Sequence, residues 1–297
     1  MKGLIRNKNK LLILFTLLTT SVCLLTGSAF GLTVKFETRD YFAWARLYDG
    51  LGNPLNTNPF DGSVTQSLSP TGTYKGADGT EDSFGITAIT RITDISGTTT
   101  IWQESASQEL TAFFRGGDDV YLSSPDPFTG NSLLASTGFV IDLWLDTTPD
   151  YTPNAGTAGR TGVSSYTTAT DGVLALALVG HTQFISGLPY TLLEDGVPST
   201  GAFTGSILFD VVGGIWGPKY DTNTVTAPND PSGNMADIKF TFATHALVPP
   251  FDPVADWLVG DTSSAIGTIV PEPSVMFLLG SGLLMIAAVR GRKFLKK

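Results

Sequence analysis

The chain has 297 residues, 15% of them charged, and its 27 acidic and 18 basic residues give a formal net charge of −9. An acidic surface repels nucleic acid and anionic lipid, so we expect neither as a partner of the body of the protein. Two histidines and a single cysteine also leave few side chains for a zinc site or for nucleophilic catalysis.

The first 29 residues have the pattern of a secretory signal peptide. An apolar run from Leu11 to Leu25 is followed by small residues from Gly27 to Ala29. The basic residues that precede the run are Lys2, Arg6, Lys8 and Lys10. We expect export to remove this segment, with cleavage after Ala29 or Gly31.

Cys23 lies inside the apolar run and is the only cysteine of the chain. Lipidation of this cysteine would require a small residue immediately before it, but Val22 is at that position. The cysteine is therefore expected to leave with the signal peptide, and the mature protein would contain no disulfide and no thiol nucleophile.

Residues 30–269 are expected to form one β-rich domain. Short runs of β-branched and aromatic residues recur between turn residues, which is typical of antiparallel strands. The predicted strands are 41–48, 84–92, 99–102, 110–114, 139–145, 173–179, 206–212, 238–242 and 256–259. Many short strands without an internal repeat predict an all-β fold, either an antiparallel sandwich or a jelly roll.

Residue pairs that contain glycine predict turns between these strands. Asp-Gly pairs favour tight turns, and they occur at 49–50, 61–62, 78–79, 171–172 and 195–196. Gly-Gly at 116–117 and 213–214 is also interpreted as a turn, because no helix with a phosphate-binding lysine follows.

The same region concentrates negative charge. Four basic residues precede it and five follow it, whereas it contains 26 of the 27 acidic residues, so residues 30–269 carry about −17. Such a surface suits solubility outside the cell and weakly attracts divalent cations.

Two groups of oxygen-bearing residues in predicted loops are candidates for a cation site. The first group is Asp118, Asp119 and Asp126, and the second is Asp146, Asp150 and Asn154. Carboxylate and amide oxygens at irregular spacing on loops suit Ca²⁺, although aspartates also serve as turn residues in such loops. Calcium is therefore the one cofactor that the sequence leaves open.

Aromatic residues in loops are candidates for stacking on sugar rings. Trp216 lies between Gly214 and Pro218 and is the best placed, and Tyr220 follows it. The other two candidates, Trp44 and Trp102, lie in apolar predicted strands and are expected in the core.

We find no catalytic constellation in the sequence and predict that the protein is not an enzyme. A Gly-x-Ser-x-Gly motif is absent, and neither His181 nor His245 has an acidic or histidine neighbour at metal-ligand spacing. If a glycoside-hydrolase carboxylate pair existed, Asp142 would be its general acid, because it shares a predicted strand face with Trp144. The other interpretation of Asp142 is a structural carboxylate bonded to nearby amides.

The last 28 residues combine a Pro-Glu-Pro step, an uncharged run and a basic end. The two prolines favour an extended backbone over 270–273. Residues 274–289 carry no charge and would form about 24 Å of helix, short of the roughly 30 Å of a bilayer core. Basic residues beside a span stay in the cytoplasm, so the body would lie on the other side of the membrane. These residues are Arg290, Arg292, Lys293, Lys296 and Lys297.

This tail resembles the PEP-CTERM sorting signal of Gram-negative bacteria. Its matching residues are Pro271, Glu272 and Pro273 in the box and Arg290, Arg292 and Lys293 in the basic end. The resemblance implies transient attachment to the inner membrane through 274–289 and cleavage near the box by an exosortase. It also implies release of the protein toward the cell surface or exopolysaccharide. An ordinary single-pass anchor that is never cut is the alternative.

The body resembles the flocculation-associated PEP-CTERM proteins. The matching segments are 81–86, 109–111, 141–146, 160–162, 171–172, 209–211 and 256–271. The resemblance implies a secreted protein that helps cells to aggregate within an exopolysaccharide matrix. We therefore favour a non-enzymatic extracellular matrix protein of flocs or biofilms. A secreted carbohydrate-binding module and an exported glycan hydrolase are the alternatives.

Overall fold

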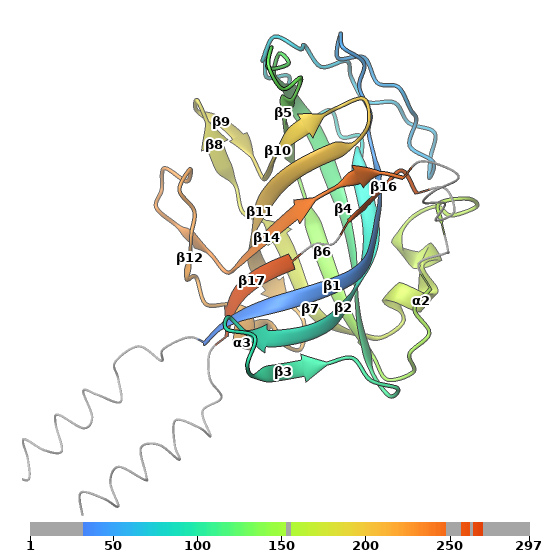
Figure 1. Cartoon of the computed structure of the whole chain (residues 1–297), viewed down its shortest axis with the longest axis vertical. Coiled ribbons are helices and arrows are strands. Elements are labelled where there is room, and N and C mark those ends of the chain that lie inside the picture. Colours follow the sequence, from blue (N-terminus) through green and yellow to red (C-terminus); the bar gives the residue numbers. More distant parts are fainter. Residues whose placement is uncertain (1–31, 153–155, 248–256, 262–263, 270–297) are drawn as a thin grey trace, which may run out of the picture. The chain divides into compact units, whose positions relative to one another are not determined.

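The computed structural model describes residues 32–152, 156–247, 257–261 and 264–269 (Figure 1). The predicted signal peptide 1–29 and the predicted sorting signal 270–297 lie outside these residues, as does Asn154. No helix in the described ranges has the length and hydropathy that a membrane span requires.

The regular structure of the described chain is mostly antiparallel β-sheet with few helical turns, which confirms the all-β prediction. Its strands are β1 (Leu32–Ala45), β2 (Ser83–Asp94), β3 (Thr100–Gln103), β4 (Glu109–Leu122), β5 (Ser132–Thr137), β6 (Val140–Asp146), β7 (Val173–Gly180), β8 (Gln183–Ile185), β9 (Leu188–Tyr190), β10 (Leu192–Val197), β11 (Ala202–Gly213), β12 (Val225–Thr226), β13 (Met235–Ala236), β14 (Ile238–Ala243), β15 (His245–Ala246), β16 (Val259–Asp261) and β17 (Ser264–Ile269). The short helical turns are η2 (Val163–Ser165), α2 (Thr167–Thr170) and α3 (Gly217–Tyr220).

Thirteen of these strands belong to one sheet, and that sheet closes on itself (Figure 1). The path β1-β2-β4-β6-β7-β11-β14-β17 returns to β1. Toward one end of the ring, β5 and β10 take the places of β6 and β7, because β4 pairs first with β6 and then with β5. Similarly, β11 pairs with β10 along its first half and with β7 along its second half. The closed path therefore contains eight strands, and toward the end of the ring formed by β5 and β10 the strand that pairs with β1 is β16.

Side chains alternate between the two faces of each strand, and the two faces have different surroundings. The inward residues form the main apolar core, to which Phe36 of β1, Phe114 of β4 and Phe209 of β11 belong. The outward residues Trp44 and Phe84 belong to a second cluster, which also contains Tyr166 and Trp257. Both faces are thus covered where the end of β1 pairs with the start of β2. This explains why β2 is buried over most of its length.

The bend between β5 and β6 depends on two glycines. Gly116 of β4 and Gly138 have φ angles of 79° and 82°, a region that favours glycine. A Cβ atom on Gly138 would lie 2.6 Å from the carbonyl oxygen of Gly116, and the reverse substitution would be similarly close. The chain that joins β5 to β6 can therefore approach β4 closely beside Gly116, where the pairing of β4 with β2 shifts its register.

All the predicted strands up to 238–242 overlap strands of the structure, but some boundaries and turns were wrong. The Gly116-Gly117 pair is inside β4 and not in a turn, and Asp195-Gly196 is inside β10. The predicted strand 256–259 begins later, at Val259. Strands β5 and β10 were not predicted, because Ser, Gly and charged residues interrupt their apolar pattern.

Gly138→Ala is expected to destabilise the fold more than Gly130→Ala does. Gly130 has a similar φ angle of 77°, but no atom lies within 4 Å of the position of its added Cβ. The control should lose about 1–2 kcal/mol from backbone strain alone, and Gly138→Ala should lose a further ~1–3 kcal/mol from the clash. Denaturant unfolding measures both values, and equal losses would contradict the close approach of the two strands.

Candidate functional site

Three carboxylates meet where β4 begins and β6 ends. Glu109 and Asp146 are register partners on these two strands, and Asp150 lies in the loop that follows β6. One oxygen from each of the three groups lies within 4.8 Å of the others. The sequence grouped Asp146 with Asp150, but it missed Glu109, which only the pairing of β4 with β6 brings to the site.

The hydrogen bonds of this cluster leave one buried carboxylate oxygen without a partner. The Glu109 carboxylate accepts hydrogen bonds from the backbone amides of Asp150 and Tyr151, at 2.9 and 3.0 Å. Asp146 Oδ1 accepts the amide of Thr148 at 3.0 Å. Asp146 Oδ2 is buried and has no partner in the described part of the chain. An unpaired buried carboxylate oxygen is costly, so a cation at this position would relieve it.

The electrostatics of the cluster favour the uptake of positive charge. Burial raises the pKa of Glu109, and repulsion from Asp150 and Asp146 adds to this effect, although the two backbone amides oppose it. The nearby Asp171 also has a raised pKa, first because of burial and then because of repulsion from the same two aspartates. A bound divalent cation would lower these pKa values by compensating the mutual repulsion.

The structure does not bring the three residues of the first predicted cation group together at one site. Asp118 and Asp119 are in β4, not in a loop, and consecutive strand residues point to opposite faces. Asp118 accepts the amide of Gly79 at 2.7 Å, and the exposed Asp126 accepts the amides of Phe128 and Thr129 at 2.8 Å each. Asp118 therefore binds the loop at Gly79 from its place in β4, and Asp126 stabilises its own turn.

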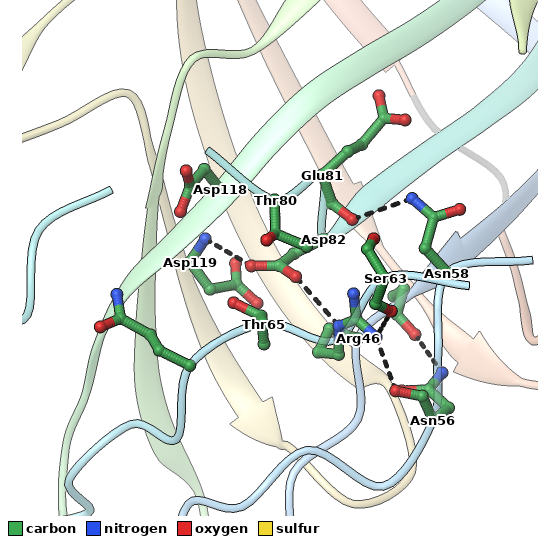
Figure 2. A network of polar contacts seen from close by, with 12 residues as sticks. Arg46, Asn56, Asn58, Ser63, Thr65, Thr80, Glu81, Asp82, Asp118 and Asp119 are labelled. Atoms are coloured by element: carbon green, nitrogen blue, oxygen red, sulfur yellow. Dashed lines mark hydrogen bonds and ion pairs between the residues drawn. The ribbon is translucent and has the colours of Figure 1, made fainter. Parts of the chain in front are cut away.

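Asp119 belongs instead to a buried polar network (Figure 2). Its carboxylate accepts hydrogen bonds from Tyr48 at 2.9 Å and from Ser136 at 2.6 Å. Asp82 lies between the Asp119 backbone and Arg46: its Oδ2 accepts the Asp119 amide at 2.9 Å, and its Oδ1 accepts Nε of Arg46 at 2.9 Å. The side chains of Arg46 and Asp82 are both fully buried.

Arg46 also binds the long loop between β1 and β2. Its Nη1 donates to the carbonyl oxygens of Asn56 at 2.6 Å and Ser63 at 3.4 Å (Figure 2). Its guanidinium lies over the Trp44 ring, 4.8 Å from the centroid. One buried arginine thus fixes the loop, the end of β1 and the start of β2.

Burial shifts three carboxyl groups at this end of the ring in the same direction. It raises the pKa of Asp82 to about 6, although Arg46 opposes the shift. It raises the pKa of Asp119 well above the ordinary value, and the charge of Asp82 adds to this. Glu194 of β10 has no hydrogen bond to its carboxylate within the described ranges, and burial alone raises its pKa to about 8.

The predicted sugar-binding residues lie together, but only Trp216 keeps some exposed surface. Tyr220 is 3% exposed and packs against Phe36 in the core, so the prediction that it stacks on a sugar is wrong. Trp216 is partly buried at the start of α3, and its ring centroid is 6.3 Å from that of Tyr220. Trp44, by contrast, is in the core as predicted.

Asp142 and His181 both have charged partners that their sequence neighbours do not reveal. Asp142 is ion-paired with Arg115 on the adjacent strand, at 3.0 Å. His181 is buried between Asp210, 2.8 Å from Nδ1, and Asp230, 3.4 Å from Nε2. These two contacts lie on opposite sides of the imidazole, so they hold β7, β11 and the loop after β12 together.

Comparisons of this chain with family models, with curated proteins and with solved structures found no match.

The raised pKa values predict that the fold is less stable at mildly alkaline than at mildly acidic pH. A carboxyl group whose pKa is higher in the folded than in the unfolded state binds its proton more tightly when folded. The free energy of unfolding should therefore decrease as the pH rises from about 5 to about 8. Below about pH 4, exposed aspartates with lowered pKa values, such as Asp94, reverse the slope.

Glu194→Gln has no proton to lose, so it should reduce this slope and unfold at higher denaturant than the wild type at about pH 8. Asp195→Asn is the matched control, because Asp195 is the exposed neighbour on the same strand. Denaturant unfolding across the pH range measures the slope. A wild-type stability that rises steadily from pH 5 to pH 8 would contradict the assignment.

Proposed function

We propose that this protein is an exported, exosortase-processed matrix protein that promotes cell aggregation with exopolysaccharide. The observation that carries the proposal is the succession of three features at the end of the sequence. These are Pro271–Pro273, the uncharged run 274–289 and the basic residues after it. The signal-peptide pattern at the other end of the chain supports it, because both ends then direct the body out of the cytoplasm.

The body has properties that suit this role. It is an acidic, antiparallel β-domain, and we propose that opposite walls of its closed sheet pack as the two faces of a sandwich. Among the described strands, β3 pairs only with β2, so it presents an open edge to which another chain can add a strand. Removal of the tail would leave this body free of the membrane and strongly negative.

Replacement of Pro271, Glu272 and Pro273 by alanine should leave the protein in the membrane fraction. The processing enzyme would no longer recognise the box, whereas the span would be intact. Cell fractionation followed by immunoblotting measures how the protein is divided between the membrane and the released fraction. The settling rate of the cells should fall when less protein is released. Ser274→Ala, immediately outside the box, is the control and should be released normally. Release of the triple-alanine variant at the wild-type level would contradict the proposal.

We further propose that Glu109, Asp146 and Asp150 bind Ca²⁺. The specific support is the unpartnered buried oxygen of Asp146 beside two further carboxylates. Extracellular calcium modules bind with dissociation constants of about 10⁻⁴–10⁻³ M, which matches a site with this few protein ligands. A bound ion would fasten the loop after β6 to the start of β4.

Calorimetric titration of the full-length protein with Ca²⁺ should show binding in the millimolar range, at roughly 10⁻⁴–10⁻³ M. Asp146→Asn should abolish the heat. Asp126→Asn changes an exposed turn aspartate outside the cluster, so this variant should bind as the wild type does. No heat and an unchanged melting temperature in the wild type at millimolar calcium would exclude the site.

A secreted carbohydrate-binding module is the second candidate function. Trp216 supports it, because this residue is partly exposed and its neighbour Ile215 is 60% exposed. A polysaccharide pull-down that depends on Trp216 would favour this candidate, whereas aggregation independent of Trp216 would favour the matrix protein. The hydrolase alternative has less support, since Asp142 is paired with Arg115.

A further inference from the structure

A cavity of about 50 Å³ lies inside the closed sheet, at the end where β5 and β10 complete the ring. Its wall is mostly aromatic and aliphatic, and Phe139, Leu192 and Phe203 are among the lining residues. A second cavity of about 40 Å³ adjoins it and is lined almost wholly by apolar residues. The two share the side chains of Tyr41, Phe114, Ile141, Phe209 and Phe240.

Four charged side chains border the first cavity: Arg46, Asp82, Asp119 and Glu194. Asp82 and Asp119 are occupied by the hydrogen bonds described above. Arg46 binds Asp82, loop carbonyl oxygens and the Trp44 ring, but its Nη2 is buried without a hydrogen-bond partner among the described residues. Glu194 alone has no hydrogen-bond donor and no ion-pair partner among the residues described. Its carboxylate is therefore the acceptor on this wall that is available to a ligand, and Nη2 of Arg46 is an available donor.

Strand geometry explains why Glu194 faces the interior. Residues two apart on a strand share a face, so Glu194 lies on the face of Leu192, which is in the core. Glu194 is surrounded by protein but keeps some accessible surface, as expected for a side chain that borders an internal hollow. An apolar residue would fill this position at lower cost, because burial of an unpaired carboxylate is unfavourable. A partly polar wall in an otherwise apolar cavity is typical of a small-molecule site.

The charge of the wall determines the sign of the ligand. The wall carries one guanidinium and three carboxyl groups. The carboxyl groups therefore either keep protons or are neutralised by an additional cation. Repulsion between Glu194 and Asp119 acts in the same direction. The aromatic rings of the wall also attract a cation through their faces. An anion could meet Nη2 of Arg46, but the three carboxyl groups of the wall outnumber this one cation.

We propose that this interior cavity binds a short primary ammonium ion, with the nitrogen at Glu194 and the alkyl chain in the adjoining apolar cavity. The two cavities together measure about 90 Å³. Because a cavity of about 150 Å³ holds benzene, with six carbons, this volume fits about four non-hydrogen atoms. Propylammonium has this size. Its binding would displace the proton of Glu194 and form an ion pair within the ring.

Thermal unfolding of the full-length protein with propylammonium chloride tests the proposal. At about 100 mM ligand and a dissociation constant near 20 mM, the melting temperature should rise by roughly 2–4 °C over equimolar sodium chloride. The assay is performed at about pH 8, where the amine is still protonated. Equimolar 1-propanol has a similar size without the charge, so it should give no comparable rise.

Two variants on the same strand complete the test. Glu194→Gln should remain folded, because it replaces an unpaired carboxyl with a neutral isostere, but it should lose the ammonium-dependent shift. Asp195→Asn should retain the shift. An equal shift with propanol, or a full shift in Glu194→Gln, would overturn the proposal. So would a wild-type melting temperature that is the same in propylammonium and sodium chloride, which would mean that the cavity holds water only.

Discussion

The buried ion pair between Arg46 and Asp82 is the interaction on which one end of the closed sheet depends. It joins the end of β1 to the start of β2, and the hydrogen bond from the Asp119 amide to Asp82 extends it to β4. Arg46 also holds the loop between β1 and β2 through two carbonyl oxygens. Removal of one partner of a buried pair costs about 3–5 kcal/mol, because the other charge is left buried and unpaired. The end of the ring and the loop beside it are therefore expected to open together.

The same network explains why acidic groups accumulate inside an acidic protein. Arg46 compensates Asp82, and two hydroxyl groups compensate Asp119, but no side chain of the described residues compensates Glu194. The raised pKa values are the direct result of this imbalance. In an apolar interior such a group is retained at a cost to stability, which is typical of residues kept for binding.

Much of the fold follows from local pattern, but the sites do not. Segments such as 84–92 and 173–179 are rich in β-branched and aliphatic residues, so the sequence predicts them as strands. Strand β10 contains Glu194, Asp195 and Gly196, and its pairing with β5 and β11 overrides a local preference for a turn. Only the pairing of strands far apart in the sequence shows that Glu109 lies beside Asp146. The same is true of Asp119, which was predicted in a loop but lies in β4 and accepts a hydrogen bond from Tyr48.

In the proposed function, this β-domain lies in the sequence between two ends that would direct it out of the cell. The central claim of the proposal is that the mature protein lacks both ends. Intact-mass measurement of protein recovered from the culture medium or cell surface tests that claim most directly. The proposal predicts the mass of a chain that begins near residue 30 and ends near the Pro271–Pro273 box. A mass that still includes Lys297 would contradict it and would identify the tail as a permanent anchor.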